Sequence, residues 1–121
     1  MKLNHVSLSV ADRERSAAFY GEHFGLTERV HEDDRRLILG EPGDGEGTGS
    51  LLALCEGTPA APGLSPDNHF GFRVASGDQV RAARERFRAA GITESEWQDS
   101  HGFVRVQVVD PDGYEVEVYA Y

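Results

Sequence analysis

The chain has 121 residues, with 21 acidic against 12 basic side chains and a formal net charge of -9. This length suits one domain, and the charge gives no electrostatic footprint for nucleic acid or an anionic membrane, so both are excluded as main partners. The single cysteine, Cys55, allows no intramolecular disulfide. The N-terminus alternates like a strand, and no apolar run is long enough to cross a bilayer. We therefore expect a cytoplasmic protein.

An internal repeat divides the chain. "NHVSLSVA" at 4–11 and "NHFGFRVA" at 68–75 share Asn, His, Val and Ala at positions 64 residues apart. A stretch with helical spacing follows each copy and stops at a glycine, so we predict helices over about residues 12–24 and 77–90. Asp12 is the expected N-cap of the first helix.

Short alternating segments follow each predicted helix and read as strands: "RRLILGE" and "GSLLALCE", then "GFVRVQVVD" and "YEVEVYAY". Each half is thus predicted to be a βαβββ module of an α+β fold, with "EPGDGEGTG" and "DPDG" as the corresponding tight turns. The expected boundaries are about 1–57 for module one, about 58–66 for a Pro- and Gly-rich linker, and about 67–121 for module two. Because neither half buries enough surface alone, the two sheets are expected to form a shared, open cleft with helices on the opposite faces.

Strand alternation assigns side chains to the two faces of each predicted sheet. The apolar positions must face the helices: Val6, Leu8, Val10, Phe70, Phe72, Val74, Val104, Val106, Val108, Val116 and Val118. The other face then receives His5, His69, Phe103, Arg105, Gln107, Glu115, Glu117 and Tyr119. Glu115 lies one pleat closer to the turn than Glu117, and we expect it to reach solvent or a basic neighbour.

Two imidazoles and one carboxylate on the same face form a set that holds a divalent transition metal and leaves coordination positions free. We therefore predict His5, His69 and Glu117 as metal ligands. A metal would also offset the cost of burying the Glu117 charge. The alternative is that the two histidines are ordinary hydrogen-bonded strand residues.

The segments "LNHVSLSVADRERSAAFYGEHFGL", "NHFGFRV" and "VVDPDGYEVEVYAY" resemble the vicinal oxygen chelate superfamily, and the resemblance covers nearly the entire chain. This superfamily includes glyoxalase I, extradiol dioxygenases, and fosfomycin- and bleomycin-resistance proteins. The resemblance implies the glyoxalase/bleomycin resistance/dihydroxybiphenyl dioxygenase fold. It places the family's metal positions on His5, His69 and Glu117, with Fe, Mn, Ni or Zn as the ion.

The chain departs from glyoxalase I at one ligand position. Glyoxalase I enzymes have a further glutamate in the first half, and the residue 64 positions before Glu117 is Ala53. The nearby Glu56 has the opposite strand parity, so it could substitute only through a bulge. The remaining pattern of three ligands resembles that of a dioxygenase- or lyase-type metalloenzyme for a small oxygen-bearing substrate. A C–As bond lyase is also similar around "NHFGFRV", but its cysteine pair is absent here.

Such an enzyme needs an acid/base group near the substrate, and the candidates are His101, Tyr119 and Arg105. His23 and His31 are interpreted as residues that face solvent or that contact the metal ligands without binding the metal. The competing function is a metal-free, bleomycin-type drug-binding protein, since the acidic balance would attract a cationic compound. A fold that retains the ligands without turnover is a third alternative. Single-module members of this superfamily work as dimers, so we expect a homodimer.

Overall fold

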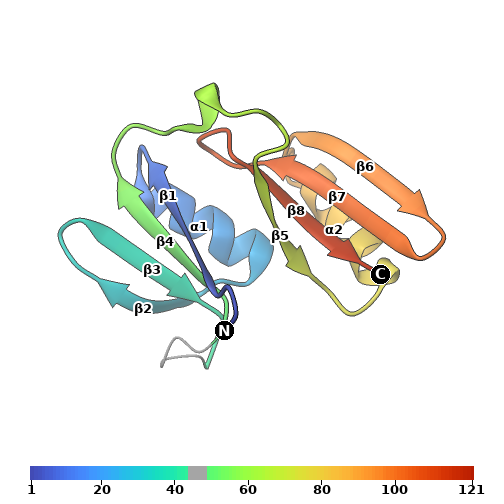
Figure 1. The fold of residues 1–121 in the computed structure, drawn as a ribbon, viewed down its shortest axis with the longest axis horizontal. Coiled ribbons are helices and arrows are strands. Elements are labelled where there is room, and N and C mark those ends of the chain that lie inside the picture. The colour runs from blue at the N-terminus through green and yellow to red at the C-terminus, as the bar shows by residue number, and fades with distance from the viewer. Residues whose placement is uncertain (44–48) are drawn as a thin grey trace. The chain divides into compact units, whose positions relative to one another are not determined.

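The computed structural model describes residues 1–43 and 49–121. The chain forms two compact units, Met1–Pro62 and Gly63–Tyr121, called here the first and second units. Each unit contains one α-helix and one four-stranded sheet (Figure 1). Among the described residues, neither helix is long and apolar enough to span a membrane.

The first unit has its strands in the order β1-β4-β3-β2. Strand β1 is parallel to β4, whereas β3 is antiparallel to both β4 and β2. Its elements along the chain are β1 (His5–Val10), α1 (Arg13–Phe24), β2 (Glu28–Glu32), β3 (Arg36–Gly40) and β4 (Leu51–Glu56). The tight turn predicted at "EPGDGEGTG" includes residues 44–48, which lie outside the described residues.

The second unit repeats this topology, with the strand order β5-β8-β7-β6 and β5 parallel to β8. Its elements are β5 (His69–Arg73), α2 (Gly77–Ala89), β6 (Glu94–Ser100), β7 (Phe103–Val109) and β8 (Glu115–Ala120), and a short 3-10 turn, η1 (Ala61–Gly63), precedes them. The predicted duplication of a βαβββ module and the α+β class are therefore confirmed.

The strands β2 and β6 carry no clear alternation, because their sequences "ERVHE" and "ESEWQDS" are polar on both faces. Each lies at the edge of its sheet, and each pairs with its neighbour through a register shift. His31 lies in β2, and about half of its side chain is exposed. Its Nε2 atom lies 3.0 Å from Oδ2 of Asp33.

The helix boundaries follow the predicted caps to within one residue. Asp12 precedes α1, and its Oδ1 atom accepts hydrogen bonds from the backbone N–H groups of Glu14 and Arg15 at 3.0 and 3.1 Å. Gly25 ends this helix with a φ of 76°, a left-handed conformation that glycine adopts without steric cost.

The core of the second unit lies between α2 and strands β7 and β8. Val80, Ala83 and Phe87 form the buried stripe of the helix. The alternate valines of β7 and β8 form the sheet side of this core: Val104, Val106, Val108, Val116 and Val118. Because strand side chains alternate, the residues between these valines project from the opposite face, called here the polar face.

An ion pair joins α2 to the edge strand β6. The Arg84 guanidinium donates to both carboxylate oxygens of Glu94, at 2.7 and 2.9 Å, and also lies 4.1 Å from the centre of the Trp97 ring. This bidentate hydrogen bond lowers the pKa of Glu94 below its ordinary value.

We predict that Glu94→Gln lowers the melting temperature by a few degrees at pH 7. A carboxylate with a depressed pKa in the folded state stabilises the fold above its unfolded pKa of about 4.3, and this contribution is lost as the pH falls through the folded value. The difference from the parent should therefore vanish near pH 2. Thermal unfolding followed by circular dichroism at both pH values tests this.

The control is Glu85→Gln, since Glu85 and Arg88 form an exposed pair 3.7 Å apart. This variant should melt like the parent at both pH values. Equal melting of Glu94→Gln and the parent at pH 7 would show that the Arg84 pair contributes nothing.

Candidate metal centre

A row of three residues crosses the polar face of the second sheet. Glu117 on β8 is aligned with Gly71 on β5 and with Gln107 on β7. Because β8 has a paired strand on each side, Glu117 projects from the interior of the sheet rather than from an edge. Only 13% of its side chain is exposed, so its charge is largely removed from water.

His69 and Glu117, two of the three predicted ligands, lie close together. The Nε2 atom of His69 is 3.6 Å from Oε2 of Glu117, and 29% of the His69 side chain is exposed. Two ligand atoms that each bind one ion at about 2.1 Å are about 3.0–3.4 Å apart in octahedral or tetrahedral geometry. A small adjustment of either side chain would therefore let both bind the same ion.

Gly71 leaves the space that the Glu117 side chain occupies. A Cβ atom at position 71 would lie 2.4 Å from Cγ of Glu117, too close for any real contact. The glutamate thus folds directly over the bare backbone of β5. Sequence reasoning did not single out Gly71, although a glycine inside a strand is a known signal of close approach.

The Oε2 atom of Glu117 is buried and has no hydrogen-bond partner among the residues that the structure describes. Leaving a buried carboxylate oxygen without a donor is costly, and such an atom calls for a cation or a proton donor. An imidazole nitrogen beside a carboxylate oxygen is a donor pair that Fe, Mn, Ni and Zn all accept. The residues present therefore fit a divalent metal ion.

His5 opens β1 in the first unit, where its side chain is exposed and the residue is aligned with Leu51. The repeat places Ser7 and Ala53 at the positions that correspond to Gly71 and Glu117, and the two are likewise paired. Ala53 has no ligand atom. Within either unit by itself, the described residues include no group of three His, Cys, Asp or Glu side chains that could hold a metal ion.

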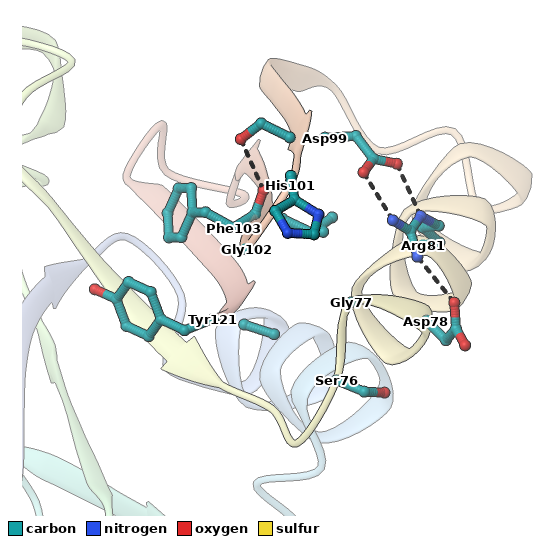
Figure 2. A pocket seen from close by; sticks show the side chains of 12 residues that line it. Ser76, Gly77, Asp78, Arg81, Asp99, His101, Gly102, Phe103 and Tyr121 are labelled. Atoms are coloured by element: carbon teal, nitrogen blue, oxygen red, sulfur yellow. Dashed lines mark hydrogen bonds and ion pairs between the residues drawn. The ribbon is translucent and has the colours of Figure 1, made fainter.

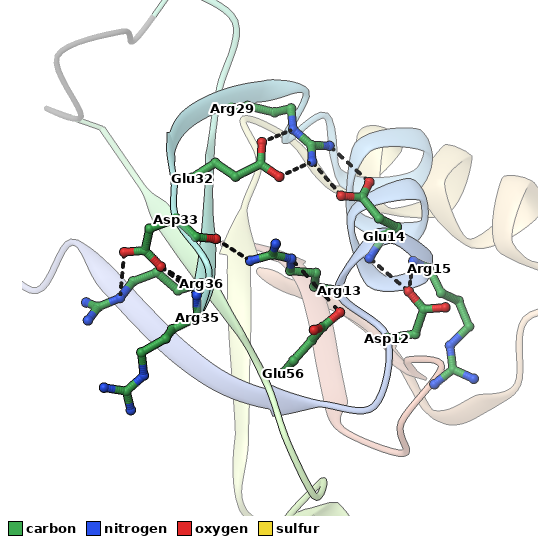
Figure 3. A network of polar contacts seen from close by, with 10 residues as sticks. All are labelled: Asp12, Arg13, Glu14, Arg15, Arg29, Glu32, Asp33, Arg35, Arg36 and Glu56. Atoms are coloured by element: carbon green, nitrogen blue, oxygen red, sulfur yellow. Dashed lines mark hydrogen bonds and ion pairs between the residues drawn. The ribbon is translucent and has the colours of Figure 1, made fainter.

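Glu56, considered as a substitute ligand, lies beside Arg13 (Figure 3). The register of β4 runs without a bulge on both sides. The Glu56 carboxylate lies 4.0 Å from Nε of Arg13, whose Nη1 donates to the backbone carbonyl of Asp33 at 2.7 Å. Glu56 therefore belongs to a polar network at the start of α1.

The three acid/base candidates lie at different distances from Glu117. Arg105 Nη1 is 3.6 Å from Oε2 of Glu117, and Tyr119 is aligned with Arg105 on the adjacent strand. His101 lies in the turn between β6 and β7, where it lines a pocket with Phe103 (Figure 2). Four residues of β7, about 13 Å of strand, separate the level of Phe103 from the level of Glu117. Arg105 and Tyr119 are thus the candidates beside Glu117.

Glu115, expected to reach solvent or a basic neighbour, is half-buried and contacts two neutral side chains. Its Oε2 atom accepts a hydrogen bond from Ser95 Oγ at 2.5 Å and another from Nε2 of Gln107 at 3.2 Å. Neutral donors therefore hold this carboxylate. The sequence did not predict the contact with Ser95, because Ser95 lies on the edge strand β6, which alternation did not reveal.

Comparison with known proteins assigns the family. The profile of the Glyoxalase/Bleomycin resistance protein/Dioxygenase superfamily matches residues 2–118. The chain belongs to this superfamily. The family that the sequence resembles is thereby confirmed, and the strand order described above is the superfamily's fold.

Two curated members of the superfamily match almost the whole chain. The probable trivalent organoarsenical cleaving enzyme of Bacillus subtilis (strain 168) is 31% identical, over 98% of this chain and 80% of its own length. Glutathione transferase FosA of Serratia marcescens is 28% identical, over 97% of this chain and 79% of its own.

Among solved structures, the fosfomycin resistance protein FosX from Listeria monocytogenes superposes with a TM-score of 0.80 at 21% identity, covering 100% of this chain and 93% of FosX. Another crystal structure of FosX, complexed with Mn(II) and a sulfate ion, gives a TM-score of 0.78 at 20% identity, over 98% of this chain and 89% of FosX.

We predict that Gly71→Val weakens binding of Mn²⁺ at least tenfold while the fold persists. The new side chain must displace Glu117 from its place above β5, whereas valine suits an exposed strand position. Calorimetric titration measures the affinity, and circular dichroism checks the fold. Arg73→Val, two residues along the same strand face, is the matched control and should bind Mn²⁺ within about threefold of the parent. Unchanged affinity in Gly71→Val would mean that Glu117 binds no metal from this position.

Proposed function

We propose that the chain is a metal-dependent enzyme of the dioxygenase or lyase type that acts on a small oxygen-bearing substrate. Its divalent metal would be held by His5, His69 and Glu117. The observation that carries this proposal is the buried Oε2 atom of Glu117, which has no hydrogen-bond partner and faces Nε2 of His69 at 3.6 Å.

In this proposal, each residue has a chemical task. His5 and His69 bind as neutral imidazoles, and Glu117 supplies one negative charge. When bound, the ion acts as a Lewis acid and as a template for the substrate's oxygens. Because Ala53 has no ligand atom, these three residues would leave room for water or substrate to bind the ion. Tyr119, beside Glu117 on β8, offers a hydroxyl that orients a substrate oxygen or gives it a proton.

The named relatives support an enzymatic role without fixing the substrate. One is described as cleaving trivalent organoarsenicals and another as a glutathione transferase. The FosX structure with Mn(II) supports a divalent ion in this fold. Cys55 is the only cysteine of this chain, so a soft arsenical would find no thiol pair here, and we favour a substrate with oxygen donors. The homodimer and the cytoplasmic location remain predictions.

We predict that the parent binds one Mn²⁺, Fe²⁺, Ni²⁺ or Zn²⁺ ion per chain in calorimetric titration, and that Glu117→Gln abolishes tight binding. The amide lacks the charge that the ion requires. Glu115→Gln makes the same change two residues away on the same face. It should bind like the parent, because Glu115 is occupied by Ser95 and Gln107.

Two outcomes would reject the metal site. Either both variants bind metal as the parent does, or the parent binds none of the four ions. The metal-free binding protein would then be the better description. Activity assays with diols and other oxygen chelators become informative only after the first titration succeeds.

A further inference from the structure

We infer that Arg105 is the counter-ion of Glu117 in the metal-free chain and competes with the metal for this carboxylate, while Glu96 draws the guanidinium away. Arg105 would thereby set the affinity of the site for its ion. The competition rests on the proposed metal site, whereas the pairing with Glu117 does not. A guanidinium keeps its protons at any working pH, so Arg105 is a positioning residue and not a proton carrier.

The register places Arg105 between two carboxylates. Glu96 and Glu117 are aligned with Gln107 from opposite sides of β7, and Arg105 lies two residues further along that strand on the same face. Its Nη2 atom donates a hydrogen bond to Oε2 of Glu96, and its Nη1 atom lies 3.6 Å from Oε2 of Glu117. One guanidinium therefore spans both acids.

The two contacts differ in kind. Glu96 is 53% exposed and takes a true hydrogen bond, whereas Glu117 is 13% exposed and receives only the proximity of the positive charge. The buried Nε atom of Arg105 likewise donates no hydrogen bond to any part of the chain that the structure describes. The guanidinium is thus anchored at its outer end and close to Glu117 at its inner end, without being locked to it.

The Arg105 guanidinium partly neutralises the buried charge of Glu117 without occupying the position of the metal. A carboxylate as buried as Glu117 is strongly unfavourable unless a positive charge is near. A divalent ion at His69 and Glu117 would supply that charge more directly, and it would repel the guanidinium at a distance of a few ångströms. Metal entry should therefore move Arg105 entirely onto Glu96, and the cost of this displacement should lower the metal affinity.

Arg73 offers a matched control. It projects from the same polar face on β5, but its guanidinium lies over the Tyr121 ring, 5.3 Å from the ring centre. Removing Arg73 takes the same charge from the same face. Any general effect of net charge on cation binding should therefore appear equally in Arg73→Gln and Arg105→Gln.

The first test is calorimetric titration of metal-free protein with Mn²⁺. We expect Arg105→Gln to bind about tenfold more tightly than the parent, the size of the repulsion between a divalent ion and a guanidinium about 5 Å apart in water. Arg73→Gln should change affinity less than about threefold, because its charge is more distant and more screened. Equal affinities for the two variants would overturn the competition.

The second test removes the outer anchor. Glu96→Gln should weaken Mn²⁺ binding several-fold, because Arg105 is then free to pair fully with Glu117. In the Arg105→Gln background, the same change should have no effect. An equal loss in both backgrounds would mean that Glu96 acts through its own charge and not through Arg105, which would overturn the assignment.

The third test needs no metal. Arg105→Gln should lower the melting temperature of the metal-free chain, and this loss should disappear in the Glu117→Gln background, since no buried charge is left to neutralise. Equal losses in both backgrounds would overturn the counter-ion role. Absence of Mn²⁺ binding in both the parent and Arg105→Gln would overturn the proposed function together with the competition. Parent binding that Arg105→Gln leaves unchanged would overturn this inference alone.

Discussion

Packing of one helix against one face of a four-stranded sheet is the contact on which each unit depends. In the second unit this contact commits every second residue of β7 and β8 to the core, and those residues are valines except for Ala120. The remaining positions have only the polar face available. Because β8 is flanked on both sides, a carboxylate on its polar face is surrounded by neighbours and loses much of its hydration. The burial of Glu117 thus follows from strand order.

The two units show how one backbone carries two different surfaces. The pairing of first and last strands is the same in both, so Ser7 and Ala53 hold the places of Gly71 and Glu117. Both copies keep a histidine at the start of their first strand. Where the first unit has a serine and an alanine, the second has a glycine and a glutamate, and only the second therefore carries a carboxylate at this position. The glycine matters because the longer side chain needs its space.

Much of this molecule follows from sequence alone. The repeat, the period-two valines and the glycines after each helix predicted both modules, their helices and the face on which His69, Arg105 and Glu117 lie. The edge strands β2 and β6 lack that period, so Ser95 and Glu96 could not be placed. Contacts such as Arg105 with Glu96 and Glu117 depend on the register of strands distant in sequence and on side-chain rotamers, neither of which a residue pattern contains.

The parallel pairing of β5 with β8 has a consequence for the folding of the second sheet. Strands β6 and β7 are joined by a short turn and can pair locally, but β5 has β8 as its sole neighbour in the sheet, and a helix and a hairpin separate the two along the chain. Non-local closure of this kind is slow, and until it occurs both edges of β5 are unpaired. His69 and Glu117 meet only when β5 pairs with β8. An ion that binds both would therefore act as a ligand of the closed sheet alone, and by mass action it would draw the folding equilibrium of the second unit towards completion.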